Sequence, residues 1–308
     1  MSAARAVVFA YHDVGVRCLK TLISAGIDVP LVVTVRDDPK EKQWYASVAA
    51  TAADYGLTVI APAEANTPEL EARVAALAPD FLFSFYYRSM LGGPLLRSAR
   101  RGALNMHGSL LPKFRGRAPV NWAILTGAHE SGATLHYMVE RADAGDIVDS
   151  QAVPILQDDD ARAVFGKVTV AAEIVLARAL PGLIAGNAPR RPQPLEPGQY
   201  FGRRRPEDGR IDWSRPALEI HNLVRAVAPP FPGAFAQVGA ERWDIYRTRL
   251  ATLRAPAGGA QLFGRDGACY AACGDGAVLR LLEAVGPRGP IELAQLAGTL
   301  ATRPLPLA

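Results

Sequence analysis

The first half of the chain alternates short apolar runs with segments of helical pattern, and this alternation limits the possible folds more than any other feature. The apolar runs lie at residues 6–10, 30–35, 57–60 and 81–85. The helical segments between them lie at residues 16–24, at 43–55 and from the N-cap Thr67 onward. Strands that are buried on both faces have continuous apolar sequences, and strands that alternate with helices form parallel sheets. The chain is therefore predicted to begin with an α/β domain on a mostly parallel, Rossmann-like sheet.

The turn after the first predicted strand argues against a dinucleotide enzyme. It reads Tyr11-His12-Asp13-Val14-Gly15, with a single glycine and an aspartate where a pyrophosphate would bind, so the G-x-G-x-x-G pattern is missing. Ligands of such sheets still bind at the carboxyl ends of the strands. That rule predicts a site at the end of the run 81–85, where Tyr86, Tyr87 and Arg88 follow.

Residues 101–107 are predicted to form a further short strand that carries two polar side chains. Side chains alternate between the faces of a strand, so Asn105 and His107 should point the same way. Gly108 and Pro112 end the strand, which places the pair at a rim. An amide N–H beside an imidazole can hold a developing oxyanion and move a proton. Taken alone, however, an Asn-x-His pair is more often structural than catalytic.

The rest of the chain is predicted to complete this domain and to form a second one. A strand at 134–139 should have Leu135, Tyr137 and Val139 on one face, and a turn at 141–145 should lead into a strand at 147–155. A helix is expected from Asp158 to Leu180, and a proline-rich linker follows it. We expect domains at 1–188 and 203–308, with the linker at 189–202. The second domain should contain a helix at 217–227 and strands at 235–238, 243–246, 268–272 and 277–282, forming a small β-barrel.

Composition excludes several classes of protein. The 308 residues include 49% hydrophobic residues and carry a net charge of +4, which suits small anionic substrates and does not require nucleic acid. No run of about 18 apolar residues is present, so a membrane span is not expected. The three cysteines indicate a reducing, cytoplasmic location, with Cys269 and Cys273 interpreted as structural. No cluster among the five histidines indicates a metal site.

The motif around His107 resembles that of a known enzyme family. Asn105-x-His107-x-Ser109-Leu110-Leu111-Pro112, followed by Arg115-Gly116 and by Asp143-x-Gly145-Asp146, is similar to the signature of the 10-formyltetrahydrofolate-dependent formyltransferases. Phe9-Ala10-Tyr11-His12-Asp13 and Phe83-Ser84-Phe85-Tyr86-Tyr87-Arg88 extend the likeness. With them, the chain resembles most closely the formyltransferase half of the bifunctional UDP-4-amino-4-deoxy-L-arabinose formyltransferase/UDP-glucuronate decarboxylase. The resemblance runs nearly from end to end and implies an OB-like fold for the second domain.

The resemblance assigns roles to individual residues. It implies that Asn105 donates a hydrogen bond to the oxyanion, that protonated His107 stabilises or protonates it, and that Asp143 favours the imidazolium by its charge. The formyl donor should be 10-formyltetrahydrofolate, with no metal, and the folate should be bound by Arg88, Leu110, Arg117, Val139, Glu140, Arg141 and Ala142. Tyr86 and Tyr87 should bind the acceptor. Arg203 and Arg204 are predicted to bind the acceptor's two phosphates, because the arginine side chain is a planar fork of donors.

The function that follows is transfer of the formyl group to the 4-amine of a UDP-4-amino-4-deoxy-sugar, with UDP-4-amino-4-deoxy-L-arabinose as the expected acceptor. The resemblance places that reaction in lipid A modification, which gives resistance to polymyxin and other cationic antimicrobial peptides. The partners expected are small molecules, without nucleic acid, and a homodimer is left open. Because the chain ends at Ala308 without a decarboxylase domain, a separate protein is expected to supply decarboxylation.

Two alternatives and one departure accompany this prediction. Methionyl-tRNA formyltransferase shares the triad, but those relatives carry a basic insertion, Pro or Ala where Gly108 stands, and Asp-Thr-Gly-Asp in place of 143–146. A non-catalytic nucleotide or nucleic-acid binding protein would not need Asn105, His107 and Asp143 together. The segment 228–232 departs from the relatives, which have Asp or Asn and Trp at the positions of Pro229 and Phe231.

Overall fold

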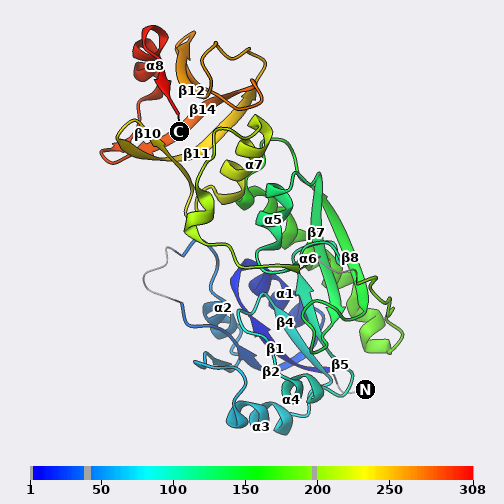
Figure 1. Ribbon diagram of the computed structural model, residues 1–308. Helices are drawn as coiled ribbons and strands as arrows, with labels where there is room; N and C mark the ends of the chain where they lie inside the picture. Colours follow the sequence, from blue (N-terminus) through cyan, green and yellow to red (C-terminus); the bar gives the residue numbers. More distant parts are fainter. Residues whose placement is uncertain (1–2, 38–42, 196–199, 308) are drawn as a thin grey trace. The chain divides into compact units, whose positions relative to one another are not determined.

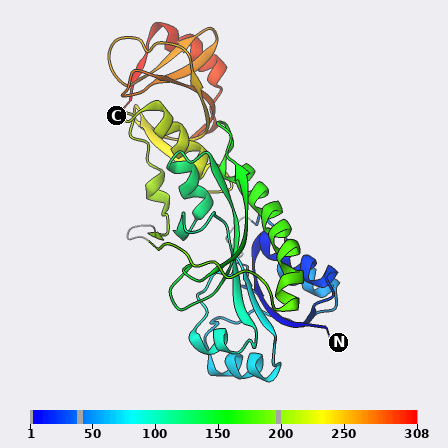
Figure 2. The same cartoon turned by 90° about the vertical axis from the view of Figure 1, so that its right-hand side faces the viewer.

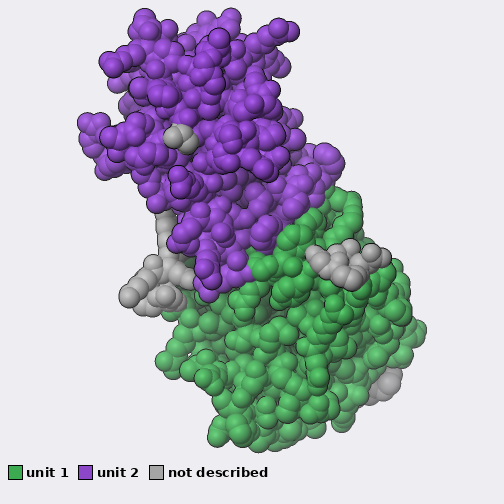
Figure 3. Space-filling model, viewed as in Figure 1, with its two compact units in different colours: residues 1–119, 130–153, 165–202 green, residues 120–129, 154–164, 203–308 purple. Residues whose placement is uncertain are grey.

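The protein forms two compact units that interleave along the sequence (Figure 3). The computed structural model describes residues 3–37, 43–195 and 200–307. The first unit holds residues 1–119, 130–153 and 165–202, and the second holds residues 120–129, 154–164 and 203–308. The division predicted from the sequence, at 1–188, 189–202 and 203–308, stays a prediction.

A seven-stranded sheet is the centre of the first unit (Figure 1). Its strand order is β3-β2-β1-β4-β5-β7-β8, and the pairs among the first five strands of this order are parallel, whereas β7 runs antiparallel to β5. This confirms the predicted α/β fold with a mostly parallel, Rossmann-like sheet. The strands are β1 (Arg5–Ala10), β2 (Asp28–Val33), β3 (Val59–Ile60), β4 (Phe81–Phe85), β5 (Gly102–His107), β7 (Glu130–Tyr137) and β8 (Ile147–Pro154).

Helices pack against the apolar side chains of this sheet. Val7, Phe9 and Leu82 form one buried cluster with Leu70 and Leu95 from two of the helices. Helices α1 and α6 lie side by side, as Figures 1 and 2 show, and are joined by an ion pair of 2.6 Å between Arg17 and Glu173. The helices are α1 (His12–Ser24), α2 (Val48–Asp54), α3 (Pro68–Ala76), α4 (Gly93–Arg97) and α6 (Ala161–Ala185).

Several helices and strands begin or end at other residues than predicted. Helix α1 begins at His12 rather than at Val16, so most of the turn predicted at 11–15 is part of a helix. Helix α2 begins only after Ser47, whose hydroxyl accepts a hydrogen bond from the Ala50 N–H and caps it. The strand expected at 57–60 is reduced to β3, and β7 starts four residues earlier than expected. Helix α6 continues past Pro181 to Ala185.

Part of the predicted linker is ordered by pairing with the first unit. Arg191 forms a β-bridge with Ile147, and strand β9 (Tyr200–Phe201) pairs in parallel with β6 (Arg115–Gly116). Residues 196–199 of the linker lie outside the described residues. Within the described part of the chain, α6 alone is long and apolar enough to cross a membrane, and 50% of that stretch is buried inside the protein, as in a core helix.

The second unit is built on an antiparallel sheet. Its order is β10-β11-β14-β13-β12-β16, with β15 paired to β14, which is consistent with the predicted OB-like domain. The sequence located β10, β11, β13 and β14 but not β12 or β16. The elements are α5 (Pro119–Leu125), η1 (Pro206–Gly209), α7 (Ala217–Val227), β10 (Ala234–Val238), β11 (Glu241–Ala251), β12 (Gln261–Arg265), β13 (Ala268–Ala272), β14 (Val278–Gly286), β15 (Gly289–Pro290), α8 (Leu293–Thr302) and β16 (Leu305–Pro306).

Candidate active site

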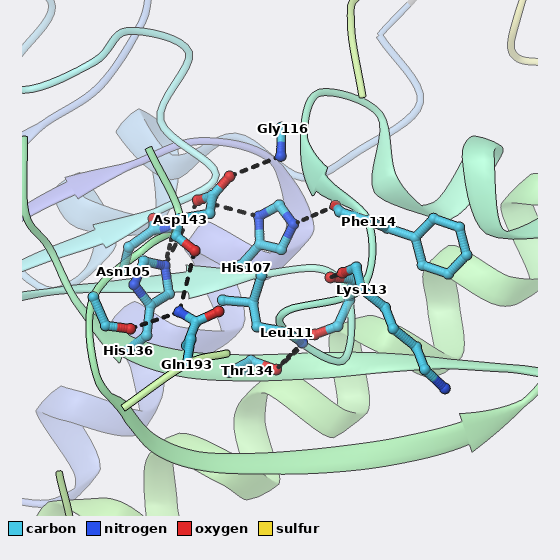
Figure 4. Close-up of polar contacts among 12 residues, drawn as sticks. Asn105, His107, Leu111, Lys113, Phe114, Gly116, Thr134, His136, Asp143 and Gln193 are labelled. Atoms are coloured by element: carbon cyan, nitrogen blue, oxygen red, sulfur yellow. Dashed lines mark hydrogen bonds and ion pairs between the residues drawn. The ribbon is translucent and has the colours of Figure 1, made fainter. Parts of the chain in front are cut away.

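Two polar side chains near the carboxyl end of β5 lie beside one carboxylate. Figure 4 shows Asn105 and His107 beside Asp143, which lies in the turn between β7 and β8. The Nδ1 atom of His107 is 3.5 Å from Asp143 Oδ1, and both side chains are largely buried. The structure therefore brings together the three residues that were predicted to be catalytic, all within the first unit.

The Asp143 carboxylate is held in its charged form. Burial by itself raises the pKa of this carboxyl, but the charge of His107, the nearby His136 and a backbone N–H together lower the pKa well below its usual range. The backbone donor is Gly116 N–H, 2.9 Å from Asp143 Oδ2. The turn itself is braced by Gln193, whose Nε2 donates to the carbonyls of Asp143 at 3.1 Å and Gly145 at 2.6 Å. A fixed negative charge therefore faces the His107 ring at neutral pH.

The other nitrogen of His107 is held by the backbone. Nε2 lies 2.9 Å from the carbonyl oxygen of Phe114, and because a carbonyl only accepts, Nε2 must carry the proton of that hydrogen bond. When the ring is protonated on both nitrogens, one proton faces Phe114 and the other faces Asp143. The surroundings of His107 thus suit an imidazolium that can stabilise an anion or give up a proton.

The loop after His107 is tied to β7 by a buried threonine. The hydroxyl of Thr134 donates to the carbonyl of Ser109 at 2.6 Å and accepts from the Leu111 N–H at 3.1 Å. Ser109 in turn donates to the carbonyl of Lys113 at 2.6 Å. These bonds fix the course of the chain up to Phe114, whose carbonyl holds His107.

Sequence reasoning missed a second histidine at this site. His136 lies on β7 directly opposite Asn105, and its Nε2 is 3.1 Å from Asn105 Nδ2 and 3.7 Å from Asp143 Oδ1. The alternation of residues 134–139 could have indicated that His136 faces the site. With Leu135 and Tyr137 assigned to one face, Thr134 and His136 had to share the other. The cross-strand register that places this face beside Asn105 could not be inferred locally.

A pocket in the first unit adjoins the turn that carries Asp143. It has a volume of about 440 Å³, within the range usual for small-molecule sites. Val139 and Glu140, both predicted to bind the folate, line it, and so does Ala144, which directly follows Asp143. Arg141 and Ala142 belong to the same turn but do not line the pocket. Its remaining walls come from α4, the start of β5, the end of β7 with the segment that follows it, and the segment after α6. These residues are Gly93, Leu96, Arg97, Gly102, Ala103, Tyr137, Met138, Gly145, Asp146 and Arg190.

The other residues predicted to bind substrates in the first unit lie around this centre without lining the pocket. Tyr86 has a buried hydroxyl that meets Gly108, so a side chain at position 108 would collide with it. Tyr87 packs edge-on against Phe9, and the Arg88 guanidinium lies 4.6 Å from the centre of the Tyr11 ring. Two further residues of this set follow His107 along the chain. Leu110 is partly buried, and the backbone N–H of Arg117 donates to the Phe201 carbonyl at 2.9 Å.

Arg203 and Arg204 belong to the second unit. Arg203 is exposed, whereas the Arg204 guanidinium lies 5.1 Å from the centre of the Trp122 ring and donates to the Asp208 carbonyl at 2.9 Å. Their role in binding phosphates stays a prediction. Among residues 3–37, 43–195 and 200–307, no group of three or more His, Cys, Asp or Glu side chains could hold a metal ion.

Comparison with known proteins identifies the family. Residues 5–180 match the formyl transferase family, and residues 204–289 match the formyl transferase C-terminal domain. The chain belongs to the formyl transferase family. Its triad of Asn105, His107 and Asp143 lies within the first of the two matched segments.

Solved structures share the fold of this formyltransferase at low sequence identity. An N-formyltransferase from Helicobacter canadensis, in complex with folinic acid and dTDP-3-aminofucose, has a TM-score of 0.71 and 20% identity over 91% of this chain and 99% of its own. A sugar N-formyltransferase from Shewanella has a TM-score of 0.62 and 19% identity over 82% of this chain and 99% of its own. HypX from Aquifex aeolicus, in complex with tetrahydrofolic acid, has a TM-score of 0.63 and 19% identity over 98% of this chain but 48% of its own.

Proposed function

We propose that this formyltransferase moves the formyl group of 10-formyltetrahydrofolate onto the amine of a nucleotide-linked amino sugar. The observation that carries the proposal is the convergence of Asn105, His107 and Asp143 beside a pocket that Val139 and Glu140 line. The folinic acid and dTDP-3-aminofucose bound by the Helicobacter relative support this pair of substrates. All of these molecules are water-soluble, and we place the reaction in the cytoplasm.

The chemistry is an acyl transfer in which the protein stabilises a developing negative charge. The neutral sugar amine attacks the formyl carbon, a C–N bond forms, and the carbonyl oxygen becomes an oxyanion. A carboxamide N–H of Asn105 donates to that oxyanion, and the imidazolium of His107 stabilises or protonates it. Asp143 keeps the positive charge of His107 balanced. The tetrahedral intermediate then collapses: the carbonyl re-forms, any proton given to the oxyanion returns to His107, and the bond to N10 breaks. N10 takes up the proton that the attacking nitrogen loses, and tetrahydrofolate leaves.

We propose that the pocket beside the triad takes the folate. Leu96 lines this pocket from α4, on an element that carries no member of the triad. Leu96→Trp should fill part of the pocket and raise KM for the formyl donor by roughly tenfold, the effect of losing about 1.4 kcal/mol of binding. KM for the amino sugar should change little. Initial-rate kinetics with each substrate varied in turn measures both constants.

Leu218→Trp is the matched control for this change. Leu218 lies on α7 and is 51% exposed, so the same substitution there fills no part of the pocket. Thermal unfolding of both variants should show that the protein remains folded. An unchanged KM for the donor in a folded Leu96→Trp enzyme would place the folate elsewhere.

We propose more specifically that the acceptor is UDP-4-amino-4-deoxy-L-arabinose and the product an intermediate of lipid A modification. This rests on the resemblance of residues 9–13, 83–88, 107–119 and 141–145 to that branch of the family. The test is incubation of the protein with formyl-folate and a panel of UDP-4-amino and dTDP-3-amino sugars, read by mass spectrometry for the gain of a formyl group. Formylation of a dTDP-3-amino sugar alone would replace the proposed acceptor. Formylation of charged methionyl-tRNA would overturn the assignment to sugars.

We also propose that Arg203 and Arg204 bind the phosphates of the acceptor. Replacing either with alanine should raise KM for the nucleotide sugar by roughly tenfold, because a charge-assisted hydrogen bond is worth about 1.5–3 kcal/mol. kcat and KM for formyl-folate should stay nearly unchanged, the pattern expected for loss of uniform binding. Arg265→Ala, at an exposed arginine paired with Asp266, is the matched control. If KM rose equally for both substrates, or for neither, these arginines would not belong to the acceptor site.

A further inference from the structure

His136 is buried beside the carboxamide of Asn105, and the proposed mechanism gives it no role. Its side chain is 2% exposed, and it projects from β7 at the position paired with Asn105 on β5. Directly opposed residues in an antiparallel pair place their side chains on the same face, within contact distance. A hydrogen bond between the His136 ring and the Asn105 side chain therefore acts directly on the amide that is proposed to hold the oxyanion.

The contacts of the ring indicate where its proton lies. Nδ1 is 2.8 Å from the carbonyl oxygen of Tyr137, and because a carbonyl only accepts, Nδ1 carries a hydrogen. In the neutral ring, Nε2 then has a lone pair and can only accept. Asn105 Nδ2 is 3.1 Å from Nε2, so one N–H of the carboxamide donates to it. Both nitrogens of a neutral His136 are thereby satisfied.

One carboxylate lies beside two imidazole rings at this site. Asp143 is the only carboxylate within 4.0 Å of either His107 or His136 in the described part of the chain. A single carboxylate can balance one imidazolium, and the proposed mechanism uses that of His107. Asn105 Nδ2, at 3.1 Å, is also closer to His136 Nε2 than the Asp143 Oδ1 atom at 3.7 Å.

We propose that His136 is a positioning residue that fixes which end of the Asn105 carboxamide takes part in formyl transfer; the inference rests on the proposed function. A carboxamide has a donor end and an acceptor end, and rotation by half a turn exchanges them. The Nε2 lone pair of His136 attracts the NH₂ end and repels the oxygen. The amide is thus held with one N–H on His136 and with its second N–H free to meet the oxyanion.

Three variants separate this role from simple packing. His136→Leu removes the acceptor, leaves the carboxamide free to rotate, and should lower kcat by roughly 10–100-fold, less than the loss of an entire oxyanion donor. KM for both substrates should change little. His136→Gln offers a carboxamide oxygen in place of Nε2 and should recover most of the rate. His129→Leu, the same change at an exposed histidine, should behave as wild type.

A double-mutant cycle with Asn105→Ala shows whether His136 acts through that amide. In the Asn105→Ala background, His136→Leu should cost less than about twofold, because interacting residues give non-additive effects. Single-turnover measurements keep such slow variants within range. A full additional loss in that background, or no recovery in a folded His136→Gln enzyme, would overturn the proposal.

A readout without substrate keeps this inference separate from the proposed function. Nitrogen NMR of ¹⁵N-histidine-labelled protein reports the protonation of each ring, and the His136 signals are those absent from His136→Gln. We expect a neutral ring with the proton on Nδ1 at neutral pH. A proton on Nε2, or on both nitrogens, would overturn the inference. If no amino sugar were formylated by the wild type, the proposed function would fail while this measurement would still test the ring.

Discussion

Replacing His107 with alanine is expected to lower turnover by roughly 10²–10⁴-fold, the usual range for losing a positioned acid–base group. The imidazole bridges two fixed acceptors, the Phe114 carbonyl at 2.9 Å and the Asp143 carboxylate at 3.5 Å, so its position is set before substrate arrives. The measurement is the single-turnover rate of formyl transfer at saturating concentrations of both substrates.

Folding and donor binding must be shown to survive the change. The variant should retain its thermal unfolding transition, and its affinity for formyl-folate, measured by fluorescence titration, should stay close to that of the wild type. His129→Ala provides the matched control, because that histidine is exposed in the second unit. Near-normal turnover in a folded His107→Ala enzyme would remove His107 from the chemistry and, with it, the proposed acid–base step.

Asn105→Ala should cost on the order of 10²–10³-fold in turnover, the range measured when one oxyanion donor is removed. The carboxamide is the side-chain amide that converges with His107 on Asp143 (Figure 4). Because the donor acts on charge that develops only during reaction, kcat should fall while binding of the formyl donor hardly changes. The same single-turnover assay, paired with the binding titration, separates these two effects.

Asn105→Asp sharpens this test, since it keeps nearly the same shape but replaces the N–H donor with a carboxylate oxygen. It should be at least as inactive as Asn105→Ala, because a negative charge would then face the oxyanion. If either variant lost donor affinity while the bound complex turned over normally, Asn105 would be a binding residue rather than an oxyanion donor.

The strands that could be recognised from their own residues were predicted correctly from the sequence. The buried runs that became β1, β2 and β4 are continuous apolar segments, and alternation along β5 correctly grouped Asn105 with His107. The start of α1 was predicted four residues too late. Its first residue, His12, has a positive φ of 66°, which is uncommon for residues other than glycine and which the sequence does not indicate.

The residues of the site that were not predicted are placed there by contacts between distant parts of the chain. His136 and Thr134 reach the centre because β7 runs antiparallel to β5 in one particular register, and local periodicity does not specify which residue faces which. Similarly, Gly116 touches Asp143 through its backbone N–H, a group that every residue except proline possesses. A residue that acts through its backbone therefore cannot be recognised from its side-chain type.

The backbone of residues 114–116 therefore links the two charged members of the triad. The carbonyl of Phe114 holds His107, the N–H of Gly116 holds Asp143, and Arg115–Gly116 pairs with Tyr200–Phe201. Neither of these two bonds uses the side chain of residue 114 or of residue 116. The number of residues between His107 and Gly116 cannot change, because one insertion or deletion would move the carbonyl and the N–H away from their partners. An engineer of this segment therefore has to preserve its length as well as Gly108 and Ser109.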